Sequence, residues 1–272
     1  MIQSQYHLKD GTRLEIYKWQ IDNPQAHLVV VHGYAEHAIR YDAFGKYLNR
    51  RGINMTSYDQ RGHGKSEGPR AYVNRFIQYV QDLKEIETII DEPFFLMGHS
   101  MGGLVLNEYL LTQDIAKIKG AISGSAALEI DPDLSPMLQR LAPILSYFLP
   151  KMKLEKLDTT TLTRSPENFE MYHSDPLNYL EGMKARIGAE MLKTIKKNRS
   201  LFNKIDVPLL VLHGEGDRIA MPGGSKKLYQ DATSSDKTLK LYPGLYHELI
   251  HEPEKDQVMK DIAGWILERR IR

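Results

Sequence analysis

The ten residues FFLMGHSMGG, residues 94–103, decide the fold of this chain. A short apolar run leads directly into the pattern Gly-x-Ser-x-Gly, and a segment typical of a helix follows it. This order is that of a nucleophile elbow, in which a serine stands on a tight, strained turn between a strand and a helix. The turn is so tight that the residues beside the serine must lack bulk. Ser100 is therefore the candidate nucleophile of a strand–turn–helix unit.

Strands and helices alternate on both sides of this unit. Residues 6–19 alternate apolar and polar side chains around Asp10-Gly11, which predicts a β-hairpin. Further strands are expected at 28–31, 53–58, 118–122, 209–212 and 237–242, and helices at 41–51, 73–90, 253–270 and after Ser100. Such an order predicts an α/β fold with a mostly parallel, twisted sheet flanked by helices.

The regular alternation stops near Gly124 and resumes near Val207. We therefore expect a core of residues 1–124 and 203–272, with residues 125–202 inserted as a helical cap. The cap contains apolar residues at helical spacing, namely Leu134, Met137, Leu138, Leu141, Leu145 and Phe148. This stripe either packs the cap against the core or lines a pocket and touches lipid, and both can hold for different faces.

Composition excludes several classes of protein. The chain has 36 Lys and Arg against 35 Asp and Glu, without a block of like charge, so no nucleic-acid footprint is expected. It has no cysteine, which excludes disulfides, thiolate metal sites and a cysteine nucleophile. The beginning of the chain does not resemble a signal peptide, and no apolar run reaches the roughly 20 residues of a membrane span. We expect a soluble, cytoplasmic protein of open oligomeric state.

A serine hydroxyl needs a base that removes its proton before it can act as a nucleophile. In strand–turn–helix hydrolases, an acidic residue and then a histidine follow the serine along the chain, in loops after later strands. Asp217 lies in the loop after the strand expected at 209–212, and Glu215 in the same loop is its competitor. His247 lies after the next strand, whereas His251 lies one helical turn further along the chain. Asp217 and His247 fit the required places better, with Glu215 as a surface residue and His251 as a solvent-facing or capping one.

The same chemistry needs two donors for the oxyanion of a tetrahedral intermediate. One is the backbone N–H of Met101, the residue after the serine, and the other belongs to the loop after the strand at 28–31. The amide of Tyr34 occupies that place. The remaining histidines, His32, His63, His99 and His213, lack the spacing of metal ligands and are interpreted as core or loop residues, so no metal is expected.

Several motifs together resemble the α/β-hydrolase superfamily and, within it, the branch of monoacylglycerol lipases and lysophospholipases. HGYAEHAIRY at 32–41 looks like the oxyanion-loop signature of that branch, and DQRGHGKSEG at 59–68 is similar to its D-x-x-G-H-G-x-S-E-G turn. GHSMGG at 98–103 matches its elbow. YHSDPL at 172–177 and the block from 236 to 247 match in part. The resemblance covers almost the whole chain.

The resemblance implies that Ser100, Asp217 and His247 form a catalytic triad and that the amides of Tyr34 and Met101 form the oxyanion hole. It places three residues near a polar glycerol head group, namely Glu36, Arg40 and Tyr172. Alternatively, Glu36 and Arg40 form an ordinary ion pair within a loop, and Tyr172 only packs within the cap. Members of this branch need no cofactor and hydrolyse the ester between a fatty acyl chain and glycerol. Their cap holds the chain and often contacts a membrane surface.

Other activities remain compatible with the same motifs. A lysophospholipase or a broad carboxylesterase would use the same triad with a different head group. A peptidase of the prolyl aminopeptidase type is disfavoured because the cap lacks an evident acidic cluster for a free amino terminus. A hydrolase-fold protein that only binds would usually have lost a triad residue, and none is missing here. Tyr34 is bulkier than the residue usual at its place, and residues 125–165, where acyl preference is determined, match least.

Overall fold

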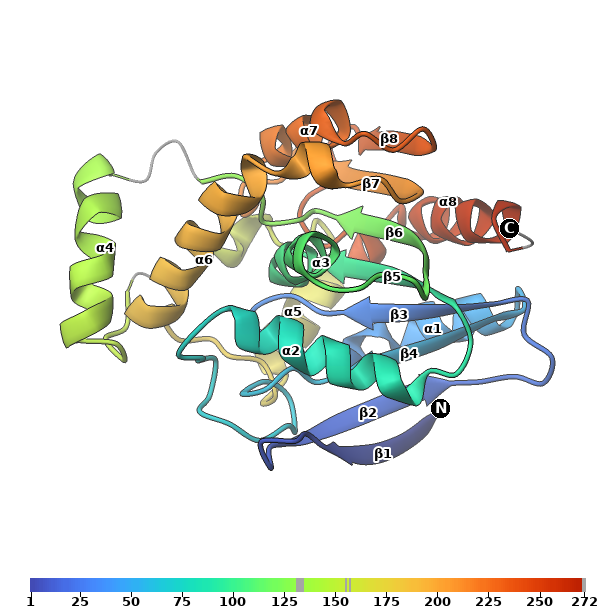
Figure 1. The fold of residues 1–272 in the computed structure, drawn as a ribbon, viewed down its shortest axis with the longest axis horizontal. Helices are drawn as coiled ribbons and strands as arrows, with labels where there is room; N and C mark the ends of the chain where they lie inside the picture. The colour runs from blue at the N-terminus through green and yellow to red at the C-terminus, as the bar shows by residue number, and fades with distance from the viewer. Residues whose placement is uncertain (131–134, 155, 157, 271–272) are drawn as a thin grey trace.

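The computed structural model describes residues 1–130, 135–154, 156 and 158–270 and is built around an eight-stranded sheet (Figure 1). The strand order is β1-β2-β4-β3-β5-β6-β7-β8. Strands β3 to β8 run parallel, and β1 and β2 form the antiparallel hairpin at one edge. The strands are β1 Ile2–His7, β2 Arg13–Trp19, β3 Ala26–Val31, β4 Ile53–Tyr58, β5 Phe94–His99, β6 Ile118–Gly124, β7 Leu209–Gly214 and β8 Lys237–Tyr242. The predicted fold class is confirmed.

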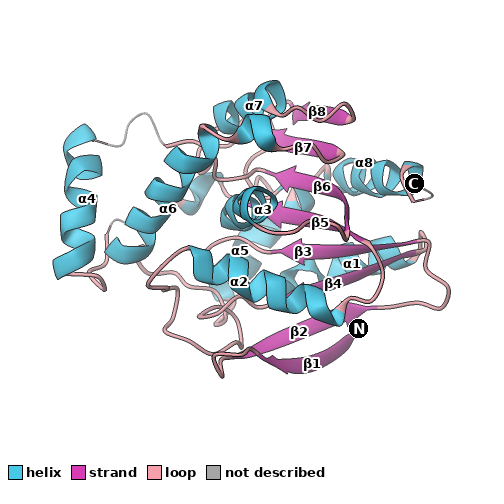
Figure 2. Cartoon of the chain, viewed as in Figure 1, coloured by secondary structure: helices cyan, strands magenta, loops and turns pink. Residues whose placement is uncertain are grey.

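Helices cover both faces of the sheet (Figure 2). Those around the sheet are α1 Asp42–Asn49, α2 Ile77–Ile86, α3 Met101–Thr112, α7 Pro222–Asp231 and α8 Lys255–Glu268. Successive residues of β3 point to opposite faces, so Val29 packs with α2 and α3 while Val30 packs with α1 and α8. Two apolar cores result, one on each side. They fix the carboxyl ends of the parallel strands along one edge of the sheet.

The hairpin and the helices α2 and α7 differ most from expectation. The hairpin begins at Ile2, earlier than the alternation at 6–19 indicates. Helix α2 begins at Ile77 and not at Val73. The side-chain oxygen of Gln78 accepts hydrogen bonds from the backbone N–H groups of Asn74 and Arg75, each at 3.1 Å, and these bonds stabilise a turn before the helix. Helix α7 was not expected, since it begins with Pro222 and two glycines, residue types that favour a turn.

Three further helices lie between β6 and β7 in the chain, where the cap was predicted: α4 Pro136–Phe148, α5 Pro166–Ser174 and α6 Ala185–Arg199. Helices α4 and α6 pack together beyond the carboxyl ends of the strands (Figure 1). The segment is joined to the core by backbone bonds such as Tyr179 N–H to Ala35 O, at 3.0 Å. The division into core and cap stays a prediction. No helix in the described ranges is both long and apolar enough to cross a membrane.

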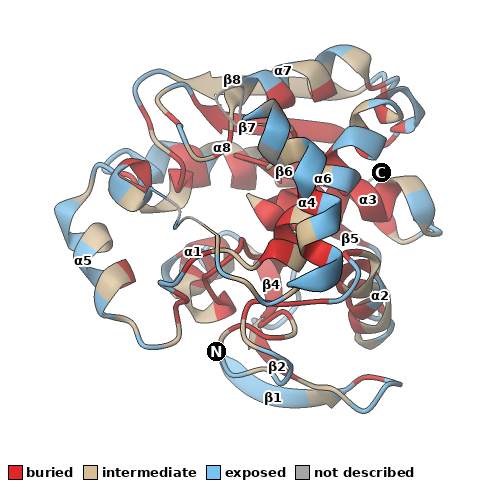
Figure 3. Ribbon diagram, turned by 90° about the vertical axis from the view of Figure 1, so that its left-hand side faces the viewer, coloured by how far each residue is buried: buried red, intermediate tan, exposed pale blue. Residues whose placement is uncertain are grey.

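The apolar stripe of α4 has two environments (Figure 3). Ala142 is buried and Leu145 half-buried on the side of α6. Most of the other large apolar side chains of this stretch face solvent, including Met137, Leu141, Ile144, Tyr147, Phe148 and Leu149. Leu134 lies outside the described residues, as does the side chain of Leu138. The described part of the stripe therefore packs inward on one side only.

Candidate active site

Ser100 stands between β5 and α3 with φ 53° and ψ −119°, a strained backbone conformation for a residue other than glycine. Its carbonyl oxygen accepts hydrogen bonds from the backbone N–H groups of Gly103, Leu104 and Ala127, and these bonds stabilise the turn. A Cβ on Gly102 would lie 2.1 Å from the carbonyl oxygen of Val31, so only glycine lets α3 approach β3 this closely. The sequence motif thus folds into the expected elbow, with Ser100 at the carboxyl end of β5.

Asp217 and His247 are in direct contact. The Nδ1 of His247 donates to Oδ2 of Asp217 at 2.7 Å. The other oxygen of Asp217 accepts the amides of Ile219 and Ala220 at 2.8 and 3.0 Å, and His213 lies 3.1 Å from Oδ2. The competitor Glu215 is exposed on the surface. The loop after β7 therefore holds one carboxylate in a fixed orientation toward His247.

The electrostatic surroundings favour an ionised Asp217. Burial alone would raise the pKa of Asp217, but the nearby His247 and the hydrogen bonds from His213 and His247 outweigh it and lower that pKa. Burial would lower the pKa of His247, yet the charge and hydrogen bond of Asp217 raise it above its usual value. His247 can therefore accept a proton and remain stable as an imidazolium ion.

Ser100 and His247 line the same small cavity, which has a volume of about 30 Å³. The ring of His99 lies 4.7 Å from that of His247, centroid to centroid. Burial, followed by the charge of His247, lowers the pKa of His99 to about 4. His99 is thus neutral near pH 7 and does not compete with His247 for a proton.

The loop after β3 runs along the nucleophile. A Cβ on Gly33 would lie 3.1 Å from the Cβ of Ser100, so the backbone here is as close to the serine as the chain allows. The amide of Gly33 donates to Oε1 of Glu36 at 2.6 Å, which fixes the loop. Tyr34 follows directly and lines the same cavity as Ser100. The assignment of the amides of Tyr34 and Met101 as oxyanion donors stays a prediction.

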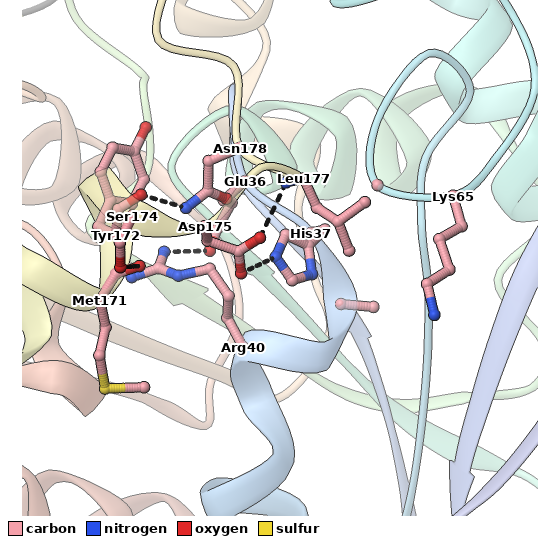
Figure 4. A network of polar contacts seen from close by, with 12 residues as sticks. Glu36, His37, Arg40, Lys65, Met171, Tyr172, Ser174, Asp175, Leu177 and Asn178 are labelled. Atoms are coloured by element: carbon pink, nitrogen blue, oxygen red, sulfur yellow. Dashed lines mark hydrogen bonds and ion pairs between the residues drawn. The ribbon is translucent and has the colours of Figure 1, made fainter.

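Glu36, Arg40 and Tyr172 lie together in one network (Figure 4). Arg40 donates from Nη1 to Oε2 of Glu36 at 2.8 Å and from Nη2 to Oε2 of Glu248 at 2.7 Å. Its guanidinium carbon lies 4.8 Å from the ring centre of Tyr172. Glu36 and Tyr172 line the cavity of Ser100, and Arg40 is buried behind them. The three residues are brought together, two of them at the cavity wall.

Glu248 completes this network and was not singled out from the sequence. Burial would raise the pKa of Glu248, but the charge of Arg40 lowers it well below its usual value. The same balance of burial and Arg40 lowers the pKa of Glu36. His251 lies 3.3 Å from Glu248 and 3.1 Å from the carbonyl of Arg40, so it is a member of the network rather than a solvent-facing residue. The sequence signal for Glu248 was a carboxylate directly after His247.

A second, larger cavity begins at Ser100 and extends toward α4 and α6. Its volume is about 280 Å³, and its walls are mostly apolar. They include Ala142 and Leu145 of α4, Met191 and Ile195 of α6, and Ile219. The small cavity, by contrast, is lined mostly by polar residues such as Glu36 and Glu248, although Leu162 and Ile219 line it too. The two cavities therefore differ in the chemistry that they accept.

Metal ligation has little support among the described residues. Nowhere in the described ranges do three His, Asp or Glu side chains gather as a ligand set. His32 and His63 are buried in the core, and His213 is held by Ser225 and Asp217. Burial, then the charge of His32, lowers the pKa of His63 to about 3. These histidines serve the packing and hydrogen bonding of the loops around the site.

Comparison with known proteins places this site in a family. The family model described as serine aminopeptidase, S33, matches residues 22–254. The chain belongs to this family. It is 32% identical to a monoacylglycerol lipase of Mycolicibacterium smegmatis over 94% of each chain, and 29% identical to phospholipase YtpA of Bacillus subtilis over 90% of this chain and 96% of that one.

A solved structure gives the same result. The crystal structure of a monoacylglycerol lipase from Paleococcus ferrophilus superimposes with a TM-score of 0.86 at 30% identity, covering 94% of this chain and 99% of that one. The resemblance inferred from the motifs is confirmed. The protein is a serine hydrolase of the α/β-hydrolase fold that acts on carboxylic esters.

Proposed function

We propose that the protein hydrolyses monoacylglycerols to glycerol and free fatty acid, with Ser100, His247 and Asp217 as its triad. The observation that carries the proposal is the position of Ser100 between a small polar cavity, shared with His247, and a large apolar one. A monoacylglycerol has a polar alcohol on one side of its ester and a hydrocarbon chain on the other. The relatives named monoacylglycerol lipase support this assignment.

The reaction follows from the roles of these groups. Nε2 of His247 takes the proton of Ser100 Oγ as this oxygen attacks the ester carbon, and Asp217 stabilises the imidazolium that forms. The amides of Tyr34 and Met101 donate to the oxyanion, each worth about 10²–10³ in rate. His247 then protonates the departing glycerol oxygen, which leaves an acyl-enzyme on Ser100. A water molecule, deprotonated by His247, releases the fatty acid and restores the serine.

The glycerol would occupy the small cavity. Glu36 and Tyr172 line it, and the charge of Arg40 favours the ionised form of Glu36. Two hydroxyl groups on the head group can donate to carboxylate oxygens or accept from a phenol. Arg40 acts in this proposal through Glu36 and Tyr172 and not by direct contact.

Purified protein with Ser100→Ala is the test. We expect it to lose monoolein hydrolysis and labelling by a fluorophosphonate probe, with an unchanged thermal melting temperature. If the Ala variant kept its turnover of monoolein, the proposal would be wrong. A wild-type protein that is folded but unreactive with the probe would instead support a binding protein.

A lysophospholipase is the second candidate, because phospholipase YtpA is among the relatives. A broad carboxylesterase is the third, with the same triad. Rates on monoolein, lysophosphatidylcholine and p-nitrophenyl esters separate the three. We expect the highest kcat/KM on the glycerol monoester, since the small cavity is lined by Glu36 and Glu248, whose charges oppose a phosphate group. A preference for lysophosphatidylcholine would reassign the substrate.

The exposed side of α4 would contact a lipid surface from which the substrate is taken. Tyr147 and Phe148 are both 72% exposed, and Met137 is 70% exposed. Exposed apolar side chains on one helix face favour binding to the membrane interface. Sedimentation with phosphatidylcholine vesicles tests this: Tyr147→Ser with Phe148→Ser should weaken binding while hydrolysis of a soluble ester persists. Equal binding by the double variant would contradict the contact.

A further inference from the structure

The side chain of Tyr34 lies where three cavities meet. It lines the small cavity of Ser100 and His247 and the apolar cavity of about 280 Å³. It also lines a third cavity of about 220 Å³, together with Thr159, Tyr172 and Tyr179. The proposed function uses only the backbone amide of Tyr34. Its ring therefore has a place in the site that the proposed reaction does not explain.

The opening from Ser100 into the apolar cavity has two walls. Besides Ser100 itself, only Tyr34 and Ile219 among the described residues line both the small cavity and the apolar one. An acyl chain on Ser100 must pass between these two side chains. They differ in what lies behind them, because Tyr34 also borders the third cavity and Ile219 does not. Tyr34 thus borders the opening into the apolar cavity and also separates that cavity from the third one.

The ring of Tyr34 is held firmly. It packs edge-on against His63 with centroids 5.7 Å apart and against Tyr179 with centroids 6.1 Å apart. His63 belongs to the core and is almost fully buried, whereas Tyr179 comes from the segment between β6 and β7. Edge-to-face pairs of this kind each favour the observed position of the ring by about 0.5–1.5 kcal/mol. In this position the ring occupies the space between the cavities.

We propose that the Tyr34 ring restricts the acyl group to an unbranched chain by separating the apolar cavity from the third cavity. The carbon next to the ester carbonyl lies at the opening between Tyr34 and Ile219. A straight chain continues from there into the apolar cavity. A second branch on that carbon would need the space beyond Tyr34, which the ring closes. This proposal rests on the proposed function and names a substrate preference of the same site.

The test compares two isomeric acyl groups on one leaving group. p-Nitrophenyl octanoate carries the straight chain, and p-nitrophenyl valproate carries two propyl branches on the carbon next to the carbonyl. Each kcat/KM is divided by the rate of alkaline hydrolysis of that ester, which removes the intrinsic effect of branching. We expect wild-type protein to prefer octanoate by about 100-fold after this correction, an effect of the size that pocket shape gives.

Three variants locate the cause. Tyr34→Ala opens the partition and should reduce the preference about tenfold or more, whereas Tyr34→Phe keeps the ring and the preference. Ile219→Ala is the matched control, since it widens the opening without joining the third cavity, and its preference should change by less than about threefold. Tyr34→Leu replaces Tyr34→Ala if the latter does not fold. All of them keep the backbone amide at position 34.

Several results would overturn the proposal. A wild-type protein that hydrolyses both esters equally well has no such partition, whatever the variants do. A folded Tyr34→Ala or Tyr34→Leu protein with the wild-type ratio, or an Ile219→Ala protein with an equal loss of preference, would mean that the ring is not the cause. Ser100→Ala separates this outcome from failure of the proposed function: if that variant still hydrolyses octanoate, the triad assignment itself is wrong.

Discussion

At the scale of single residues, Glu248 lies next in the chain to the proposed base and influences its protonation. Burial lowers the pKa of His247, while Asp217 raises it most and Glu248 and Glu36 raise it further. His247 must be neutral to accept a proton, so kcat/KM rises as the pH increases through the pKa of His247. Because the pKa of His247 is raised, this acidic limb of the pH profile lies above the ordinary histidine pKa of about 6.5.

Glu248→Gln removes one of the negative charges that raise this pKa. It also leaves the charge of Arg40 less compensated, which acts in the same direction. We therefore expect the acidic limb of the pH profile of kcat/KM to move to lower pH on a p-nitrophenyl ester. Glu215→Gln, an exposed carboxylate in the loop after β7, is the control and should leave the limb in place. A limb that moves upward in Glu248→Gln would contradict this balance of charges.

Asp217 is expected to act by holding His247 in one tautomer. Asp217→Asn keeps the shape but replaces the acceptor of the Nδ1–H bond, so we expect kcat on a p-nitrophenyl ester to fall by about 10⁴-fold. Glu215→Gln should stay close to wild type. The reverse pattern, with Glu215→Gln impaired and Asp217→Asn active, would exchange the two carboxylates.

Chain order was enough to nominate the proposed triad, because the carboxyl ends of parallel strands meet at one edge of the sheet. It was not enough for Glu248 or His213. Glu248 pairs with Arg40, which is 208 residues away in the chain. His213 contacts Asp217 because the loop after β7 turns back toward the strand. Their roles depend on packing, which no local pattern encodes.

At the scale of elements, the joint of β5 and α3 depends on the absence of a side chain at Gly102. A Cβ there would lie 2.1 Å from the carbonyl oxygen of Val31, a backbone atom that cannot move without disturbing β3. Gly102→Ala should therefore lower the free energy of unfolding by about 3 kcal/mol, measured by urea denaturation.

The control for this substitution is a helical glycine with open space around it. A Cβ on Gly264 of α8 would meet no atom within 4 Å. Gly264→Ala should raise the free energy of unfolding by roughly 0.5–1 kcal/mol, because alanine loses less conformational freedom in a helix. Equal effects of the two substitutions would mean that the clash at Gly102 is absorbed by the backbone.

The existence of the strands was easier to predict than the limits of the helices. Strand β5 begins with a short apolar run and is buried along its whole length, and the apolar run is visible in the sequence. Helix α2 begins late because Gln78 binds the two amides before it, and α7 begins in residues typical of a turn. The side-chain bonds of Gln78 to the backbone before α2 become apparent only in the folded chain.

At the scale of the whole molecule, the buried histidines make stability depend on pH. Burial lowers the pKa of His63 to about 3 and that of His99 to about 4, so both stay neutral in the folded protein at pH 5. In the unfolded chain they take up protons below about pH 6.5. Because the unfolded chain binds more protons at these two residues, their contribution to stability falls as the pH decreases from 7 to 5. His247 opposes this trend, since its raised pKa favours the folded state at low pH.

Substitution isolates the contribution of one of these histidines to the dependence of stability on pH. His63 donates from Nδ1 to the carbonyl of Arg61 and packs against Tyr34 and Tyr79, away from the proposed triad. Between pH 7 and pH 5, the free energy of unfolding of His63→Gln should decrease by about 2 kcal/mol less than that of the wild type. Urea denaturation at each pH measures this difference. His7→Gln, at an exposed histidine in β1, is the control and should keep the wild-type slope. If His63→Gln lost as much stability as wild type, His63 would have to be protonated in the folded core, and the packing of the loop beneath Tyr34 would need another explanation.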